Sequence, residues 1–157
     1  MTVNVMFVCL GNICRSPTAH GIFASMVHDA GLQQQIAVDS CGTSAWHIGN
    51  SPDERSVAMA AERGFDLSTL RASQIQVTDF QRFDYILAMD EQNLSDLKAV
   101  EPDGYFGCLD LLLSFDTENS VREVPDPYYG GDAGFRLAVQ LIESASEKLL
   151  NHIRSTL

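Results

Sequence analysis

A cysteine and an arginine near the N-terminus are separated by five residues, in the run Cys9-Leu10-Gly11-Asn12-Ile13-Cys14-Arg15-Ser16. The thiol of Cys9 is a potential nucleophile, and the guanidinium of Arg15 is a permanent cation whose planar fork binds two oxygens of one phosphate. Because positive surroundings stabilise a thiolate over a thiol, we expect Cys9 to lose its proton easily. The spacing therefore predicts a phosphate-binding loop that carries its own nucleophile.

The elements on either side of this run must aim it. Residues 3–8, apolar except for Asn4, predict a buried strand. Ser16 followed by Pro17 predicts the start of a helix, with Ser16 as the N-cap and Pro17 at the first helical position. A strand–loop–helix junction points several backbone N–H groups and the positive helix end at one place, which makes it an anion site.

The rest of the chain alternates strands and helices, which is typical of an α/β fold with a parallel sheet. We expect helices over residues 17–30, 51–64, 91–100 and 133–154, and strands over 36–39, 84–89 and 108–111. A capping box, Ser51-Pro52-Asp53-Glu54, begins the second helix, and Asp90 is expected to cap the third. Apolar residues at spacings of three and four give the last helix one buried face.

Polar segments follow three of the predicted strands. Cys9 follows the first strand, residues 40–46 follow the second, and Asp90 follows the third. In parallel sheets, ligands bind beyond the carboxyl ends of the strands. We therefore expect these three segments to lie at one edge of the molecule.

A nucleophilic cysteine that acts on a phosphate ester needs a proton donor for the leaving oxygen. The best candidate is Asp126, in the segment Val124-Pro125-Asp126-Pro127-Tyr128-Tyr129-Gly130. The two prolines stiffen the backbone, and the adjacent tyrosines can form an aromatic wall for a flat substrate. On composition alone, an ordinary connecting loop explains this segment better.

Size and charge limit the possible functions. With 157 residues, 45% hydrophobic and 20% charged, the chain fits one globular domain, residues 1–157. A net charge of −11 disfavours binding to nucleic acid or an anionic membrane. Neither a secretory signal nor a membrane-spanning run is apparent, so we expect a cytoplasmic protein. The negative charge does not exclude an anionic ligand, because a loop of amides and Arg15 act at contact distance.

Metal binding and structural disulfides are not expected. The four cysteines contain no Cys-x2-Cys pair, and the spacing of the four histidines matches no usual ligand set. We interpret the histidines as surface residues or as polar residues with ordinary partners.

The run Cys9–Ser16 near the N-terminus, together with Asp126-Pro127-Tyr128-Tyr129-Gly130, resembles the low-molecular-weight protein tyrosine phosphatases. The likeness extends over the whole chain, including Asp39-Ser40, Trp46, Ile48-Gly49 and residues 85–94. It implies a small doubly wound four-stranded parallel sheet with helices on both faces and the phosphate loop after the first strand. It also implies hydrolysis of phosphotyrosine and aryl phosphate monoesters through a phosphocysteine, with no metal or cofactor.

The resemblance also implies roles for individual residues. Cys9 would attack phosphorus, Arg15 would bind the phosphate oxygens, and Asp126 would serve as acid and then as base. Ser16 would stabilise the Cys9 thiolate as a leaving group. The substrate-binding residues would be Leu10, Gly11, Asn12, Ile13, Cys14, Ser16, Ser40, Trp46, Tyr128 and Tyr129.

Within that set, Trp46 and Tyr129 are expected to wall a deep crevice that suits phosphotyrosine better than the shorter phosphoserine. Asn12 and Ser40 would hold the phosphate loop in shape. The chain has Leu70 where family members often have His, and Ser73 where they have a basic or polar partner, so we expect a less rigid loop. Cys14 is either a small buried residue or, as the resemblance suggests, the partner of Cys9 in a protective disulfide.

Two other functions remain to be weighed. Arsenate reduction uses the same kind of anion loop, but it needs a relay of further cysteines, and the edge of the third strand reads Ala88-Met89-Asp90 with no thiol. A phosphate-binding module without turnover would need neither a nucleophile nor an acid. We therefore expect a phosphatase acting on a phosphotyrosine-containing protein or a small aryl phosphate, as a monomer or weak dimer.

Overall fold

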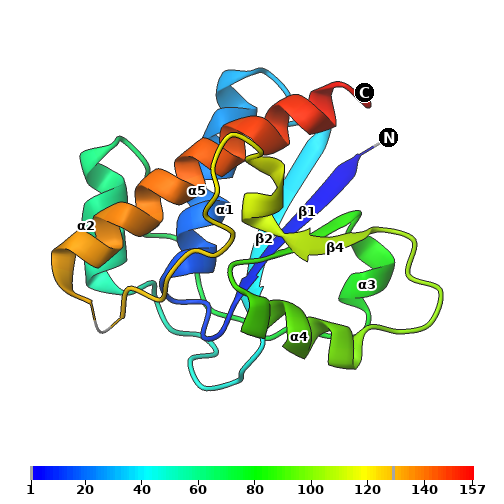
Figure 1. The fold of residues 1–157 in the computed structure, drawn as a ribbon, viewed down its shortest axis with the longest axis horizontal. Coiled ribbons are helices and arrows are strands. Elements are labelled where there is room, and N and C mark those ends of the chain that lie inside the picture. The colour runs from blue at the N-terminus through cyan, green and yellow to red at the C-terminus, as the bar shows by residue number, and fades with distance from the viewer. Residues whose placement is uncertain (1, 129) are drawn as a thin grey trace.

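The computed structural model describes residues 2–128 and 130–157. At its centre is a four-stranded parallel sheet with the strand order β2-β1-β3-β4 (Figure 1). The strands are β1 Val3–Cys9, β2 Ile36–Gly42, β3 Tyr85–Ala88 and β4 Cys108–Leu111. The chain leaves β2 at one edge and re-enters the sheet at β3, on the other side of β1. This reversal places a crevice at the carboxyl end of β1, as expected for a doubly wound sheet.

Helices cover both faces of the sheet (Figure 1). They are α1 Arg15–Asp29, α2 Glu54–Glu62, α3 Asp79–Arg82, α4 Glu91–Val100 and α5 Gly131–Arg154, with a 3-10 turn η1 at Leu112–Phe115. On one face α1 and α5 pack together on the sheet, and α2 packs against both helices. On the other face α3 and α4 contribute to a second, smaller core.

The central strand β1 divides its side chains between these two cores. Val5 and Phe7 face the α1–α5 side, whereas Met6 and Val8 face the α3–α4 side. All four side chains are buried, because a parallel strand with helices on both faces has no solvent-exposed side. The strand is thereby held from both sides up to Cys9.

Several predicted elements are confirmed. The strand at 108–111 and the helix at 91–100 have the expected bounds, and the Asp90 carboxylate accepts the N–H of Asn93 as its N-cap. The apolar face of α5 is buried in the larger core, as its periodicity indicates. The strand β2 extends three residues further than predicted, to Gly42, because its last residues pair with Val8 and Cys9.

Two predicted helix starts are wrong. Ser16 does not cap α1: the helix begins at Arg15, and Ser16 lies in its first turn with its hydroxyl directed to other partners. The helix α2 begins after Asp53 rather than Ser51, because the Asp53 carboxylate accepts the N–H of Arg55. In residues 2–128 and 130–157, no helix combines the length and apolar character needed to span a bilayer.

Candidate active site

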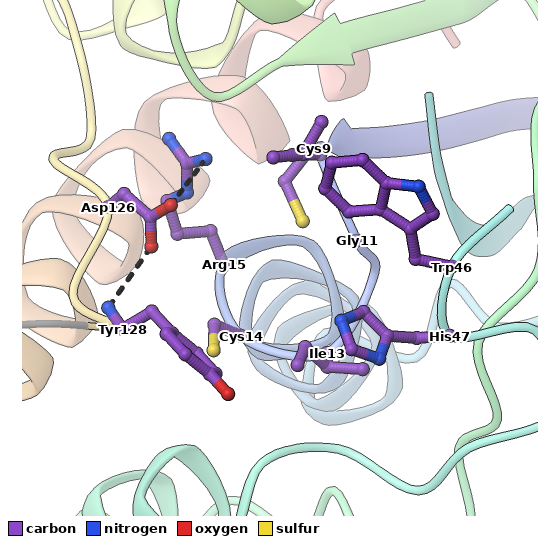
Figure 2. Close-up of a pocket in the computed structure, with 10 residues that line it drawn as sticks. Cys9, Gly11, Ile13, Cys14, Arg15, Trp46, His47, Asp126 and Tyr128 are labelled. Carbon is purple, nitrogen blue, oxygen red and sulfur yellow. Dashed lines mark hydrogen bonds and ion pairs between the residues drawn. The ribbon is translucent and has the colours of Figure 1, made fainter. Parts of the chain in front are cut away.

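A cavity of about 180 Å³ lies at the carboxyl end of β1. Its lining residues are Cys9, Leu10, Gly11, Ile13, Cys14, Arg15, Trp46, His47, Asp126 and Tyr128. Figure 2 shows the Cys9 sulfur pointing into the space between Trp46 on one side and Asp126 and Tyr128 on the other. The structure thus brings together segments that are more than one hundred residues apart in the chain.

The loop between β1 and α1 is held by the side chain of Asn12. This residue has a left-handed backbone with φ of 57°, a conformation that asparagine tolerates better than most residues. Its Oδ1 accepts the N–H of Ser73 at 2.9 Å, and its Nδ2 donates to Ser16 Oγ at 2.7 Å. Both polar ends of the buried Asn12 amide therefore have partners. They tie the loop to Ser73 on one side and to Ser16 in α1 on the other.

The end of β2 supports the same loop from outside. The N–H groups of Thr43 and Ser44 donate to the carbonyl oxygens of Cys9 and Leu10, at 2.9 and 3.0 Å. A Cβ at Gly42 would lie 2.7 Å from the Leu10 oxygen, so only glycine allows this approach without displacement. With carbonyl groups of the loop bonded outward in this way, its N–H groups are left to serve an anion.

Cys9 is buried at the bottom of the cavity and has Ser16 as its nearest polar neighbour. The Cys9 Sγ lies 3.0 Å from Ser16 Oγ and accepts a hydrogen bond from the Ser16 N–H at 3.4 Å. A hydroxyl and an amide at the N-terminus of α1 both favour negative charge on the sulfur. This arrangement suits a thiolate that acts as a nucleophile and later as a leaving group.

The guanidinium of Arg15 is held by two oxygen acceptors and lies near a third oxygen. Its Nη1 donates to Asp90 Oδ2 at 2.6 Å and to the Val124 carbonyl at 3.0 Å, and its Nη2 lies 3.8 Å from Asp126 Oδ2. Burial alone would lower the pKa of Arg15, but Cys9 and Asp90 outweigh it and the pKa is raised. The group therefore remains cationic beside the cavity in spite of being 3% exposed.

Asp126 lies at the mouth of the cavity, with its side chain 45% exposed. Its Oδ1 accepts the N–H of Tyr128 at 3.1 Å, and Figure 2 shows its other oxygen directed toward Arg15. A carboxyl group that is accessible to water and close to a bound anion is well placed for proton transfer.

Two aromatic rings border the cavity. Trp46 is 76% exposed and Tyr128 is 39% exposed, so both present ring surface to an incoming ligand. His47 lies next to Trp46 and packs so closely on the loop that a Cβ at Gly11 would come within 2.8 Å of the imidazole. The sequence predicted Trp46 and Tyr129 as the walls and Tyr128 only as a further substrate-binding residue. It interpreted His47 as an ordinary polar residue.

Cys14 lines the cavity close to Cys9, and all four cysteines are free thiols. Burial, reinforced by Asp53, raises the pKa of the Cys14 thiol to about 12. At neutral pH it is therefore protonated and does not compete with Cys9 as a nucleophile.

Three predicted residues need separate comment. Ser40 does not line the cavity: its hydroxyl pairs with His20 Nδ1 at 3.0 Å, and its carbonyl accepts the Ser73 hydroxyl at 3.3 Å. Ser73 thus joins Ser40 to Asn12, and both the Oδ1 and the Nδ2 of Asn12 have a partner although Leu70 offers no donor. Tyr129 lies outside the described residues.

Asp90 was placed at the ligand-binding edge by the sequence, but its contact with Arg15 was not predicted. It was interpreted as a helix cap at the sheet edge, and that role is confirmed, but its second oxygen also binds Arg15. The only available signal was its position directly after β3, at the edge where ligands bind. Among the described residues, no cluster of His, Cys, Asp and Glu could hold a metal ion.

Comparisons with known proteins agree with this geometry. Residues 4–157 match the family described as low molecular weight phosphotyrosine protein phosphatase. The phosphatases of that name from Schizosaccharomyces pombe and Homo sapiens are each 43% identical to this chain, over 85% and 88% of both sequences. A crystal structure of a protein tyrosine phosphatase from Entamoeba histolytica superposes with a TM-score of 0.94 and 34% identity, covering 99% of each chain.

Proposed function

The chain belongs to the low molecular weight phosphotyrosine protein phosphatase family and is a protein tyrosine phosphatase, and we propose that Cys9, Arg15 and Asp126 perform its reaction. The observation that carries this assignment is that a sulfur, a guanidinium and a carboxyl group border one cavity at the carboxyl end of β1. No other group of residues described above combines a nucleophile, an anion-binding cation and a proton donor.

The first half of the reaction transfers the phosphoryl group to sulfur. The Cys9 thiolate attacks phosphorus, and the S–P bond forms as the bond from phosphorus to the phenolic oxygen breaks. Arg15 and the N–H groups of residues 10–15 bind the non-bridging oxygens and stabilise their charge. Asp126 donates its proton to the departing oxygen, so that the product leaves as a neutral phenol. The result is a phosphocysteine at Cys9.

The second half of the reaction restores the enzyme. Asp126, now a carboxylate, accepts a proton from a water molecule that attacks phosphorus. The S–P bond breaks, phosphate leaves, and Cys9 departs as a thiolate. Ser16 Oγ, 3.0 Å from the sulfur, donates a hydrogen bond to that thiolate. The protons and electrons balance without a metal or cofactor.

The depth and walls of the cavity support phosphotyrosine as the substrate class. Cys9 is buried, whereas the rings of Trp46 and Tyr128 lie at the exposed rim. A phenyl group spans this depth and stacks on aromatic walls. The short side chain of phosphoserine would hold its phosphate too far from the sulfur. Family membership does not favour arsenate reduction, the alternative expected from the anion loop.

Other properties follow as proposals from family membership and composition. We propose a cytoplasmic location, a phosphotyrosine-containing protein or small aryl phosphate as substrate, and a monomer or weak dimer as the working form. Sedimentation of the purified protein over a range of concentrations measures the last of these. A stable tetramer would contradict it.

We also propose that oxidation of Cys9 is reversible. A sulfenic acid at Cys9 would condense with the Cys14 thiol, forming an S–S bond and releasing water. After peroxide treatment, a thiol reductant should then restore the activity of the wild type but not that of Cys14→Ala. Equal recovery of both proteins would contradict a protective disulfide.

The catalytic assignment is tested with two substitutions. Cys9→Ser removes the nucleophile with little change in size, so turnover of a phosphotyrosine peptide should be lost while the peptide still binds. Asp126→Asn should slow hydrolysis of phenyl phosphate by about 10²- to 10⁴-fold, and much less for an ester whose leaving group needs no proton. Cys108→Ser, remote from the cavity, is the matched control. Wild-type turnover by Cys9→Ser would refute the assignment.

A further inference from the structure

Arg55 in the first turn of α2 has contacts that the reaction above does not use. Its side chain is anchored by Asp53, whose Oδ1 accepts from the Arg55 Nε and whose Oδ2 accepts from Nη2, both at 3.1 Å. Asp53 in turn donates its N–H to the carbonyl of Ile13 at 2.7 Å. The guanidinium of Arg55 is therefore tied, through one residue, to the backbone of the phosphate loop.

The Asp53–Arg55 pair is favourable in the folded protein. Burial by itself would raise the pKa of Asp53, but the hydrogen bonds and charge of Arg55 outweigh it and lower that pKa. A two-point contact between a carboxylate and a guanidinium also fixes the plane of the guanidinium. The orientation of Arg55 is thus set before any ligand arrives.

The same guanidinium contacts two aromatic rings. Its Cζ lies 4.6 Å from the centroid of the Phe135 ring and 5.3 Å from that of Tyr128. Phe135 is 2% exposed and belongs to the core under α5, whereas Tyr128 is 39% exposed at the rim of the cavity. Arg55 thus joins a fixed core ring to the ring that borders the active site, through cation–π contacts with both.

Tyr128 also connects this contact to the proton donor. Its N–H donates to Asp126 Oδ1, and Figure 2 shows its ring forming one side of the cavity. A half-exposed ring on a loop has several orientations open to it unless a neighbour holds it. The guanidinium of Arg55 is such a neighbour: it is flat and charged, and Asp53 already fixes its orientation.

We propose that Arg55 is a positioning residue that holds the Tyr128 ring as a wall for the aromatic part of the substrate. This inference rests on the proposed function, because it concerns how the same cavity recognises a phenyl group. Arg55 does not touch the phosphate site, so its contribution concerns the ring of the ligand and not the anion. The bound phenyl group would pack on a wall that is already ordered, which lowers the entropic cost of binding.

The test compares two ligands that differ by the ring, inorganic phosphate and phenylphosphonate, with binding measured by calorimetry. Arg55→Met should weaken phenylphosphonate by about twofold to fivefold, with phosphate unchanged. Arg55→Lys retains a cation above the ring and should recover part of the loss. Arg63→Met, at the C-cap of the same helix but paired with Glu143, is the control and should change neither ligand.

A double-mutant cycle tests whether the effect acts through Tyr128. In a Tyr128→Leu background, Arg55→Met should have no further effect on phenylphosphonate. Equal weakening of both ligands by Arg55→Met, no weakening of either, or an effect that persists without the Tyr128 ring would each overturn the inference. Failure of the wild type to bind phosphate at all would instead count against the proposed function, so the two failures are distinguishable.

Discussion

Arg15 has two tasks: it must remain charged while it is buried, and its guanidinium must keep one orientation. Both tasks depend on Asp90, whose Oδ2 accepts from Nη1 at 2.6 Å, and on the Val124 carbonyl, which accepts from the same nitrogen. Breaking a buried pair by removing one partner leaves an uncompensated charge, which costs more than the pair itself contributes. The position of the guanidinium therefore depends on Asp90, which does not itself line the cavity.

Asp90→Asn tests this dependence. Asparagine is as good an N-cap as aspartate, so α4 should keep its first turn while Arg15 loses its anionic partner. We expect kcat/KM for an aryl phosphate to fall by about tenfold to one hundredfold, as for loss of a hydrogen bond to a charged group. Asp96→Asn, on the exposed side of α4, is the matched control. Unchanged kinetics in Asp90→Asn would show that Val124 alone suffices to hold Arg15.

Among the elements, α1 and β2 are joined by a partly buried polar contact. His20 on α1 bonds through Nδ1 to the Ser40 hydroxyl on β2. Burial lowers the pKa of His20, and the charge of Asp39 opposes this only in part. The neutral imidazole is consequently favoured in the folded protein, because a charge on it would lose hydration there.

This lowered pKa gives the fold a pH dependence of known sign. Below the unfolded-state pKa of about 6.5, the unfolded chain binds a proton at His20 before the folded chain does. The free energy of unfolding should therefore fall as the pH drops below that value, until the lower folded-state pKa is passed. Urea unfolding of the wild type and of His20→Gln, at about pH 7.5 and at about pH 5, measures the change in the free energy of unfolding. That change should be smaller in the variant than in the wild type.

His28→Gln controls for removing a histidine, because His28 is on the same helix with its side chain 74% exposed. It should lose as much stability on acidification as the wild type does. If His20→Gln and the wild type show the same loss between the two pH values, burial of the imidazole does not contribute to the pH dependence.

The helices and strands also show which features local sequence patterns predict and which depend on the fold. The cap at Asp90 and the strand at 108–111 depend on local patterns, and both are confirmed. Ser16 was misassigned as a cap because its hydroxyl is taken by Cys9 and Asn12, which a local pattern does not reveal. The ion pair of Asp90 with Arg15 and the stacking of Arg55 on Tyr128 join distant segments, so they depend on the fold and were not predictable from spacing.

For the molecule as a whole, one arginine, Arg15, lines the cavity of a strongly negative protein. The net charge is −11, from twenty-one acidic and ten basic residues. Arg15 is buried at the cavity and already paired with Asp90, so it contributes little field beyond the cavity. Attraction at contact and repulsion at a distance thus act on the same substrate, and their balance depends on ionic strength.

The long-range repulsion is separated from the contacts within the cavity by comparing two phosphotyrosine peptides. One is flanked by acidic residues and the other by lysines. The Debye length falls from about 30 Å at 0.01 M salt to about 8 Å at physiological ionic strength. Screening should therefore raise kcat/KM for the acidic peptide and lower it for the basic one, with the change lying mainly in the association rate. Salt also competes with the phosphate for Arg15, but it does so equally for both peptides, so the ratio of the two kcat/KM values isolates the global field. A ratio independent of salt would mean that the surface charge lies too far from the cavity to act, and that substrate choice rests on contacts within the cavity alone.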